Sequence, residues 1–152
     1  MILLSLLNSP IELLAVIVGF LLIGIPIHEF AHAYVANKYG DPTAKLEGRL
    51  TLNPLAHLDP MGLVFFFMIG FGWGKPVPVN PRLFKSEKDD LKVSIAGIVA
   101  NLLVAFILGI PIRIAILQGH LIDSSIYLSF IDYVLVINIM LAVFNILPIP
   151  PL

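Results

Sequence analysis

The sequence predicts an all-α membrane protein, and its composition and apolar runs carry this prediction. Of the 152 residues, 59% are hydrophobic and only 12% are charged, and the mean hydropathy is +0.98. Soluble domains are typically about half apolar and about a quarter charged. The apolar residues also form runs long enough to cross a bilayer as helices. We therefore expect a single domain over 1–152 with three membrane-spanning helices, at about 10–39, 93–117 and 126–147.

The first span has a clear start and a clear stop. Ser9, Pro10 and Glu12 combine a candidate N-cap, a proline at the first helical position and an acidic residue in the first turn. Gly40-Asp41-Pro42 is a typical helix stop. The helix between these signals would be about 45 Å long at 1.5 Å per residue, which is enough to cross a bilayer and emerge from it.

A mixed region, at about 41–91, separates the first two spans. Met61–Gly74 is apolar but too short to cross, so we expect a re-entrant or interfacial segment there. Apolar and polar residues alternate in two short stretches bounded by turn residues, Leu46–Asn53 and Val77–Asn80, and this pattern favours small β-strands. An edge strand at Leu46–Asn53 or Lys75–Asn80 would be able to hold an unwound peptide by strand addition.

The remaining spans and the placement of charge predict a topology. Val93–Leu117 and Ile126–Leu147 are both long enough to cross, and prolines follow the second of them. All lysines and arginines except Arg113 lie within Lys38–Lys92. Because cytoplasmic loops are enriched in basic residues, we expect this region to face the cytoplasm in a multi-pass protein of the cell membrane.

The composition also narrows the classes of partner and site. The net charge of −1 gives no reason to expect a nucleic acid as a partner. The chain has no cysteine, so a metal site would have to use histidine, carboxylate or water. The sequence does not predict an oligomeric state.

His28-Glu29-Phe30-Ala31-His32 places three ionisable side chains in the last third of the first span. A charge at the centre of a bilayer costs about 2.5–3.5 kcal/mol, so a functional reason is expected. On a helix, His28 and His32 lie one turn apart on one face, as two zinc ligands would. Glu29 would act as the general base of metal-assisted hydrolysis. The alternative is a pair of buried histidines that satisfy each other.

Further motifs accompany this run, and together they carry a resemblance. In chain order they are Gly48–Pro54, His57–Pro60, Gly72–Pro81, Ser94–Gly97 with Asn101, and Asn145-Ile146-Leu147-Pro148-Ile149-Pro150-Pro151-Leu152. With the His-Glu-Phe-Ala-His run, they resemble the site-2 proteases, in particular their compact bacterial and archaeal branch. These proteins are intramembrane zinc metalloproteases that cut transmembrane helices of other membrane proteins.

The resemblance implies one zinc ion held by His28 and His32, with Glu29 as the catalytic residue. The family's third zinc ligand is the Asp of a Leu-Asp-Gly motif, and this Asp would be the residue directly after Leu152. We therefore expect the chain to be a fragment that is inactive alone. The site would lie nearer the cytoplasmic face, and the partners would be transmembrane protein substrates and the lipid bilayer.

Other polar residues remain open to two interpretations. The resemblance assigns Asn101, Asn145 and Pro148 to the support of the active site, but the two amides would serve equally as contacts between helices. Asp59 and Asp132 are candidate substitutes for the third ligand, although Asp59 suits a loop and Asp132 lies near the opposite end of the last span.

Two other functions compete with the protease. One is a catalytically inactive pseudoprotease that binds and retains a membrane helix. The other is a metal transporter that uses the histidine pair as a transient site. A transporter would be expected to carry polar residues on several spans, whereas here they cluster on one.

Overall fold

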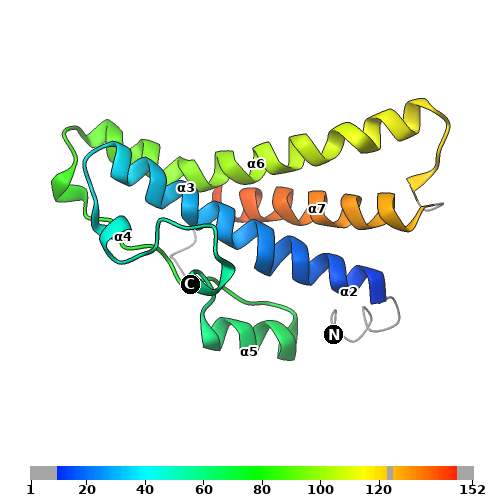
Figure 1. Ribbon diagram of the computed structural model, residues 1–152, viewed down its shortest axis with the longest axis horizontal. Helices are drawn as coiled ribbons and strands as arrows, with labels where there is room; N and C mark the ends of the chain where they lie inside the picture. The colour runs from blue at the N-terminus through cyan, green and yellow to red at the C-terminus, as the bar shows by residue number, and fades with distance from the viewer. Residues whose placement is uncertain (1–9, 123–124, 147–152) are drawn as a thin grey trace.

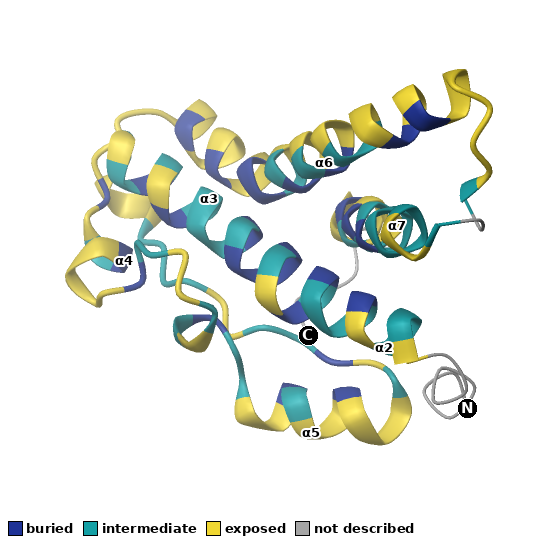
Figure 2. Cartoon of the chain, turned by 45° about the vertical axis from the view of Figure 1, so that its right-hand side comes forward, coloured by how far each residue is buried: buried dark blue, intermediate teal, exposed yellow. Residues whose placement is uncertain are grey.

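The computed structural model describes residues 10–122 and 125–146 of the chain, and in these ranges the fold is helical (Figure 1). Three helices are long and apolar enough to cross a membrane, namely Pro10–Lys38, Glu87–Leu117 and Ile126–Ile146. The prediction of an all-α membrane protein is confirmed. Many large apolar side chains on these helices are exposed, as expected for surfaces that face lipid (Figure 2).

The first span is built from three consecutive helical stretches. These are α2 (Pro10–Val16), the π-helical stretch η1 (Ile17–Gly24) and α3 (Ile25–Lys38). Pro26 lies in the first turn of α3 and has no backbone N–H to donate to the preceding turn. A π-helical stretch beside such a proline is a common way for a helix to adjust its backbone hydrogen bonds.

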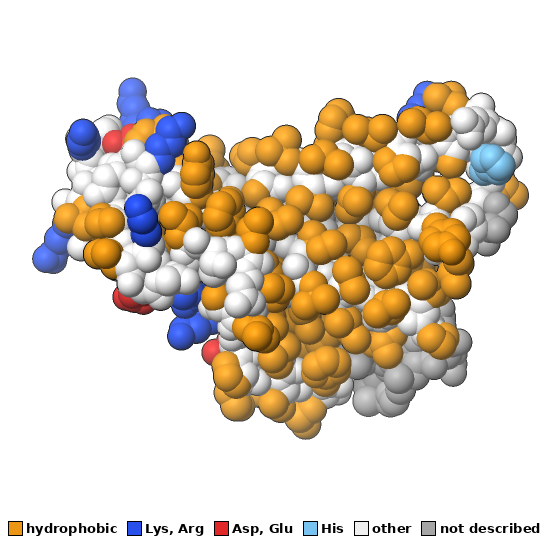
Figure 3. Space-filling view, viewed as in Figure 1, with side chains coloured by type: hydrophobic (Ala, Val, Ile, Leu, Met, Phe, Trp, Pro, Cys, Tyr) orange, Lys and Arg blue, Asp and Glu red, His pale blue; other side chains and the backbone are white. Residues whose placement is uncertain are grey.

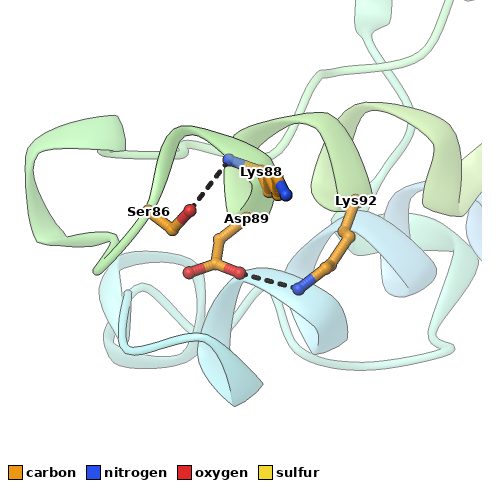
Figure 4. A network of polar contacts seen from close by, with 4 residues as sticks. All are labelled: Ser86, Lys88, Asp89 and Lys92. Carbon is orange, nitrogen blue, oxygen red and sulfur yellow. Dashed lines mark hydrogen bonds and ion pairs between the residues drawn. The ribbon is translucent and has the colours of Figure 1, made fainter.

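The helix α6 (Glu87–Leu117) contains the second predicted span and begins six residues before it. Ser86 is its N-cap, and the Ser86 hydroxyl accepts a hydrogen bond from the Lys88 N–H at 3.2 Å (Figure 4). Acidic residues in the first turn, including Asp89, favour this start because they face the positive end of the helix dipole. The polar first turns therefore extend the apolar helix toward the basic end of the molecule.

The third span, α7 (Ile126–Ile146), packs closely against the first. A Cβ at Gly19 would lie 3.2 Å from the Cα of Val134, and one at Gly24 would lie 2.4 Å from Leu141. The later glycine of the first span meets the later residue of α7, so the two helices run parallel. Glycines thus allow the first and third spans to approach each other closely.

The region between the first and second spans contains only short helices. They are α4 (Thr43–Leu46), η2 (Pro54–Ala56), α5 (Pro60–Ile69) and η3 (Pro81–Leu83). The chain around α5 leaves and returns at one place, because Leu58 and Gly74 form a β-bridge and the Lys75 N–H donates to the His57 carbonyl at 2.8 Å. At about 15 Å, α5 is only half as long as the hydrocarbon core is thick. This segment is therefore too short to cross a membrane, as expected for a re-entrant or interfacial segment.

The small β-strands do not form in the region that the structure describes. Leu46–Asn53 contains the end of α4 followed by turns and bends, and Val77–Asn80 joins no ladder. Proline favours an extended backbone in the residue before it, so we call Val77–Asn80 the extended segment. Pro76 and Pro78 lack N–H groups, and the N–H of Val77 between them is bound to the Glu29 carboxylate. The N–H groups of Val77 and Asn80 are thus engaged within the chain, and strand addition along this segment stays a prediction.

Asp41 ties the end of the first span to the extended segment. Its side chain is fully buried and accepts hydrogen bonds from the Thr43 N–H at 3.0 Å, the Thr43 hydroxyl, and the Asn80 N–H at 2.6 Å. Burial alone would raise the pKa of Asp41, but the hydrogen bonds from Thr43 and Asn80 outweigh it and hold the pKa below its ordinary value of 3.8.

We expect Asp41→Asn to lower the thermal stability at neutral pH, because hydrogen bonds to a charged group contribute about 1.5–3 kcal/mol. The folded-state pKa of Asp41 is depressed, so its contribution is present above the unfolded-state pKa and is lost as the pH falls through the folded-state pKa. Melting of the purified protein in detergent at pH 7 and at pH 3 should therefore show a difference from wild type that shrinks in acid. Glu47→Gln, at an exposed position, is the matched control. An equal difference at both pH values would contradict this role.

Basic side chains gather at the end of the molecule where α3 stops and α6 begins (Figure 3). Hydrophobic side chains cover most of the rest of this face. The helix α5 lies beside the first span, where Phe66 stacks on Phe20 with ring centroids 5.2 Å apart. The molecule thus has one basic end and an apolar body.

Candidate metal centre

His28 and His32 converge on one point in α3. Their Nε2 atoms are 3.0 Å apart, and the His32 Nδ1 lies 2.7 Å from the Val93 carbonyl of α6. Because a carbonyl only accepts, the Nδ1 of His32 carries the proton and its Nε2 presents a lone pair toward His28. The contact with α6 therefore sets the tautomer and the orientation of His32.

Gly97 of α6 makes room for the His28 ring. A Cβ at position 97 would lie 2.5–2.6 Å from three ring atoms of His28, which is far inside van der Waals contact. Only glycine allows the ring to rest against the backbone of α6 at this point. Ser94–Gly97 was singled out from the sequence as a motif, and the structure gives its glycine a physical role.

Asn101 lies one helical turn beyond Gly97, next to the same histidine ring. Its side chain is fully buried, and neither its Oδ1 nor its Nδ2 has a hydrogen-bond partner. The Nδ1 of His28 is also buried without a partner. Buried polar atoms are normally satisfied, so this cluster has the character of a functional site. An Asn101 amide that accepts from the Nδ1 of His28 would direct the Nε2 of His28 toward a metal.

Glu29 is held beside the histidines by the extended segment. Its Oε2 accepts a hydrogen bond from the Val77 N–H at 2.8 Å, and the carboxylate is only half-buried. This contact restricts the side chain to one orientation. The Glu29 side chain thus links α3 to the chain that returns from α5, one residue after His28.

Arg49 is a buried residue whose role the sequence did not reveal. Its guanidinium donates to the carbonyl of Lys75 at 2.6 Å and to that of Pro76 at 3.4 Å. These carbonyls directly precede Val77, so Arg49 positions the N–H group that holds Glu29. Burial lowers the pKa of the neighbouring His57, and the Arg49 charge adds to this, whereas the hydrogen bond to the Thr51 carbonyl opposes it.

A zinc ion fits the histidine pair but needs further ligands. Two nitrogens bound at 2.0–2.1 Å to one tetrahedral ion are about 3.3 Å apart, close to the 3.0 Å between the two Nε2 atoms. Among the described residues, no group of three His, Cys, Asp or Glu side chains could hold a metal. Asp59 caps α5 by accepting from the Gly62 N–H at 2.8 Å, and neither it nor Asp132 joins the pair.

The C-terminal candidates are only partly described. Asn145 is exposed, and its Nδ2 donates to the Leu141 carbonyl of its own helix at 2.7 Å. Gly24 contacts Leu141, and the two helices run parallel. One turn further along each helix, position 145 therefore lies at the level of His28. Pro148 lies outside the described residues, as does the segment that would lead to the third ligand.

Asn138 of α7 is a second buried amide that sequence reasoning missed. Its Nδ2 donates to the Val134 carbonyl at 2.8 Å, and its Oδ1 is buried without a partner. A Cβ at Gly24, one turn before His28, would lie 3.6 Å from this Oδ1. An amide in the middle of an apolar span was the available signal, because such groups are costly in lipid.

These features define a class of protein: a membrane protein with three helices long enough to cross a bilayer, one of which carries two histidines with converging nitrogens. No family model and no solved structure matches the chain. The chain is 43% identical to "Putative zinc metalloprotease YwhC" of Bacillus subtilis (strain 168), in an alignment that covers 94% of the chain and 67% of that protein. It therefore belongs to the zinc metalloprotease family that this protein represents.

Mycobacterial relatives agree with this assignment. The chain is 33% identical to "Putative zinc metalloprotease Rip2" of Mycolicibacterium smegmatis and 32% identical to Rip2 of Mycobacterium tuberculosis. Each alignment covers 90% of the chain and 53% of the relative. The chain thus spans about half the length of these relatives and two thirds of the Bacillus protein.

Proposed function

We propose that the chain is the membrane core of a zinc-dependent endopeptidase of the site-2 protease type, which hydrolyses peptide bonds within transmembrane helices of other membrane proteins. The observation that carries this proposal is the convergence of the His28 and His32 Nε2 atoms to 3.0 Å inside a span, with Glu29 fixed beside them. Ionisable side chains are costly inside a membrane span, so their presence needs a functional reason, and hydrolysis provides one.

His28 and His32 would hold one zinc ion, and an Asp that follows Leu152 would be the third ligand. Zinc, when bound, acts as a Lewis acid toward the scissile carbonyl and acidifies a water molecule. Glu29 would accept a proton from that water while the water oxygen forms a bond to the carbonyl carbon. Glu29 then delivers the proton to the leaving amine as the carbon–nitrogen bond breaks.

The site would open toward the cytoplasm. His28 lies about 15 Å along the helix axis from Lys38, where the span ends among the basic residues. Because basic loops face the cytoplasm, water would reach the site from that side. A substrate helix must unwind there, since its carbonyls are otherwise occupied by internal hydrogen bonds. Asn101, Asn145 and Pro148 would support this site.

The test is cleavage of a model transmembrane substrate by the full-length protein in liposomes. We expect cleavage that stops when a chelator removes zinc and returns when zinc is added back, with new termini inside the substrate's membrane segment. A substrate that is bound but never cut by the zinc-loaded protein would contradict the proposal and favour a pseudoprotease. Cleavage that survives complete removal of zinc would also contradict it.

A further inference from the structure

A groove of about 580 Å³ runs along the surface between α3 and α6, on the apolar body of the molecule. Three alanines, Ala31, Ala96 and Ala100, line it where the two helices meet. Larger and more exposed side chains flank them, such as Tyr34 of α3 and Leu103 of α6. The small residues leave an apolar channel that follows the helix axes.

One end of the groove is cationic. Lys38 of α3 and Lys92 of α6 both line it, together with Tyr39. The Lys92 ammonium is 2.9 Å from Asp89 and 4.3 Å from the centre of the Tyr39 ring, and Figure 4 shows its side chain reaching toward Asp89. Lys38 is exposed. Two cations against one carboxylate leave this end of the groove with a net positive charge.

The length of the groove matches one leaflet of a bilayer. From Lys92 to Ile107, its lining on α6 extends for about 22 Å at 1.5 Å per residue. Half of a bilayer measures about 20–22 Å when the headgroup region is included, whereas a spanning helix needs about 30 Å. A single lipid molecule therefore fits the groove better than a transmembrane helix does.

We propose that this groove binds an anionic phospholipid, with one acyl chain along the alanines and the phosphate group at Lys38 and Lys92. Basic sites between membrane helices on the cytoplasmic side are typical places for anionic headgroups. The lipid would brace α3 against α6, and the same helix pair carries the hydrogen bond from His32 to the Val93 carbonyl. This inference does not depend on the proposed hydrolysis.

The test uses a phosphatidylglycerol that carries a photoactivatable diazirine in one acyl chain, in phosphatidylcholine nanodiscs that contain the full-length protein. We expect crosslinks concentrated on 27–38 and 92–107 when the labelled peptides are mapped. The double variant Lys38→Gln, Lys92→Gln should reduce this labelling about tenfold. Each basic residue near an anionic headgroup adds to the binding free energy, and Asp89 offsets part of the attraction that the two lysines provide. A phosphatidylcholine probe with the same acyl chain should be unaffected by the double variant.

Matched variants separate the groove from the general lipid surface. Lys45→Gln with Lys85→Gln removes two exposed charges from the same end of the molecule but outside the groove, and should leave labelling unchanged. Ala100→Phe should fill the groove and displace the acyl chain, whereas Val136→Phe on α7 should not. Labelling spread evenly over the spans, or equal labelling by the two lipids, would overturn the proposal. So would equal labelling of the wild type and the Lys38/Lys92 variant.

Discussion

Glu29→Gln is expected to reduce peptide hydrolysis by the full-length protein about 10²–10⁴-fold, the usual contribution of general acid–base catalysis. The amide is nearly isosteric with the carboxylate, and its oxygen can still accept the hydrogen bond that Val77 donates to Oε2. It cannot take a proton from water at neutral pH. The variant should therefore fold as the wild type does but hydrolyse peptide bonds far more slowly.

The measurement is initial cleavage rate in liposomes, with zinc content determined on the same preparations. We expect zinc content to remain at the wild-type level, because His28 and His32 are unchanged. Glu47→Gln, at an exposed position outside the site, should cleave at the wild-type rate. A Glu29→Gln variant that cleaves within twofold of wild type would remove Glu29 from the role of general base.

The candidate site was predictable to the extent that its geometry is local. Two histidines four residues apart on one helix must share a face, so the sequence alone indicated the pair. The partners that orient them come from elsewhere: Val93 and Gly97 lie on α6, and Val77 lies in the extended segment. These contacts depend on how the spans pack, which the helical pattern does not encode.

Arg49 illustrates the same limit in the region between the spans. It contacts carbonyls 26 and 27 residues further along the chain, and a carbonyl carries no side-chain signal. The expected strands failed for a related reason. Alternation of apolar and polar residues predicted a strand at Val77–Asn80, but Pro78 has no N–H to donate and the N–H groups of Val77 and Asn80 bind side chains of the first span and its end.

The three helices that are long enough to cross a membrane lie where the apolar runs predicted spans, because apolar length can be read from the sequence. The helix α6 begins ahead of the predicted span, since Ser86 and the acidic first turn are polar and are not part of an apolar run. The re-entrant or interfacial segment was also inferred from length. Its closure by the bridge between Leu58 and Gly74 adds what length cannot show, namely that its two ends meet.

Gly97→Ala is expected to weaken zinc binding by the full-length protein about 100-fold, the upper end of the effect of removing support from metal ligands. The new methyl group would lie 2.5–2.6 Å from three atoms of the His28 ring, so the ring must move away from α6. Its Nε2 would then no longer converge with that of His32. The substitution should not destabilise the helix itself, since alanine is a better helix former than glycine by about 1 kcal/mol.

Competition with a chromogenic chelator would measure the zinc affinity of Gly97→Ala. The matched control is Gly109→Ala on the same helix, where the new Cβ would meet only Leu135 at 3.6 Å, an ordinary contact. Both substitutions add one methyl group to α6, so a loss specific to position 97 reports on His28 rather than on helix packing in general. If Gly97→Ala bound zinc as tightly as Gly109→Ala, the close approach of α6 would not be what positions His28, and the metal centre would have to be assembled by other contacts.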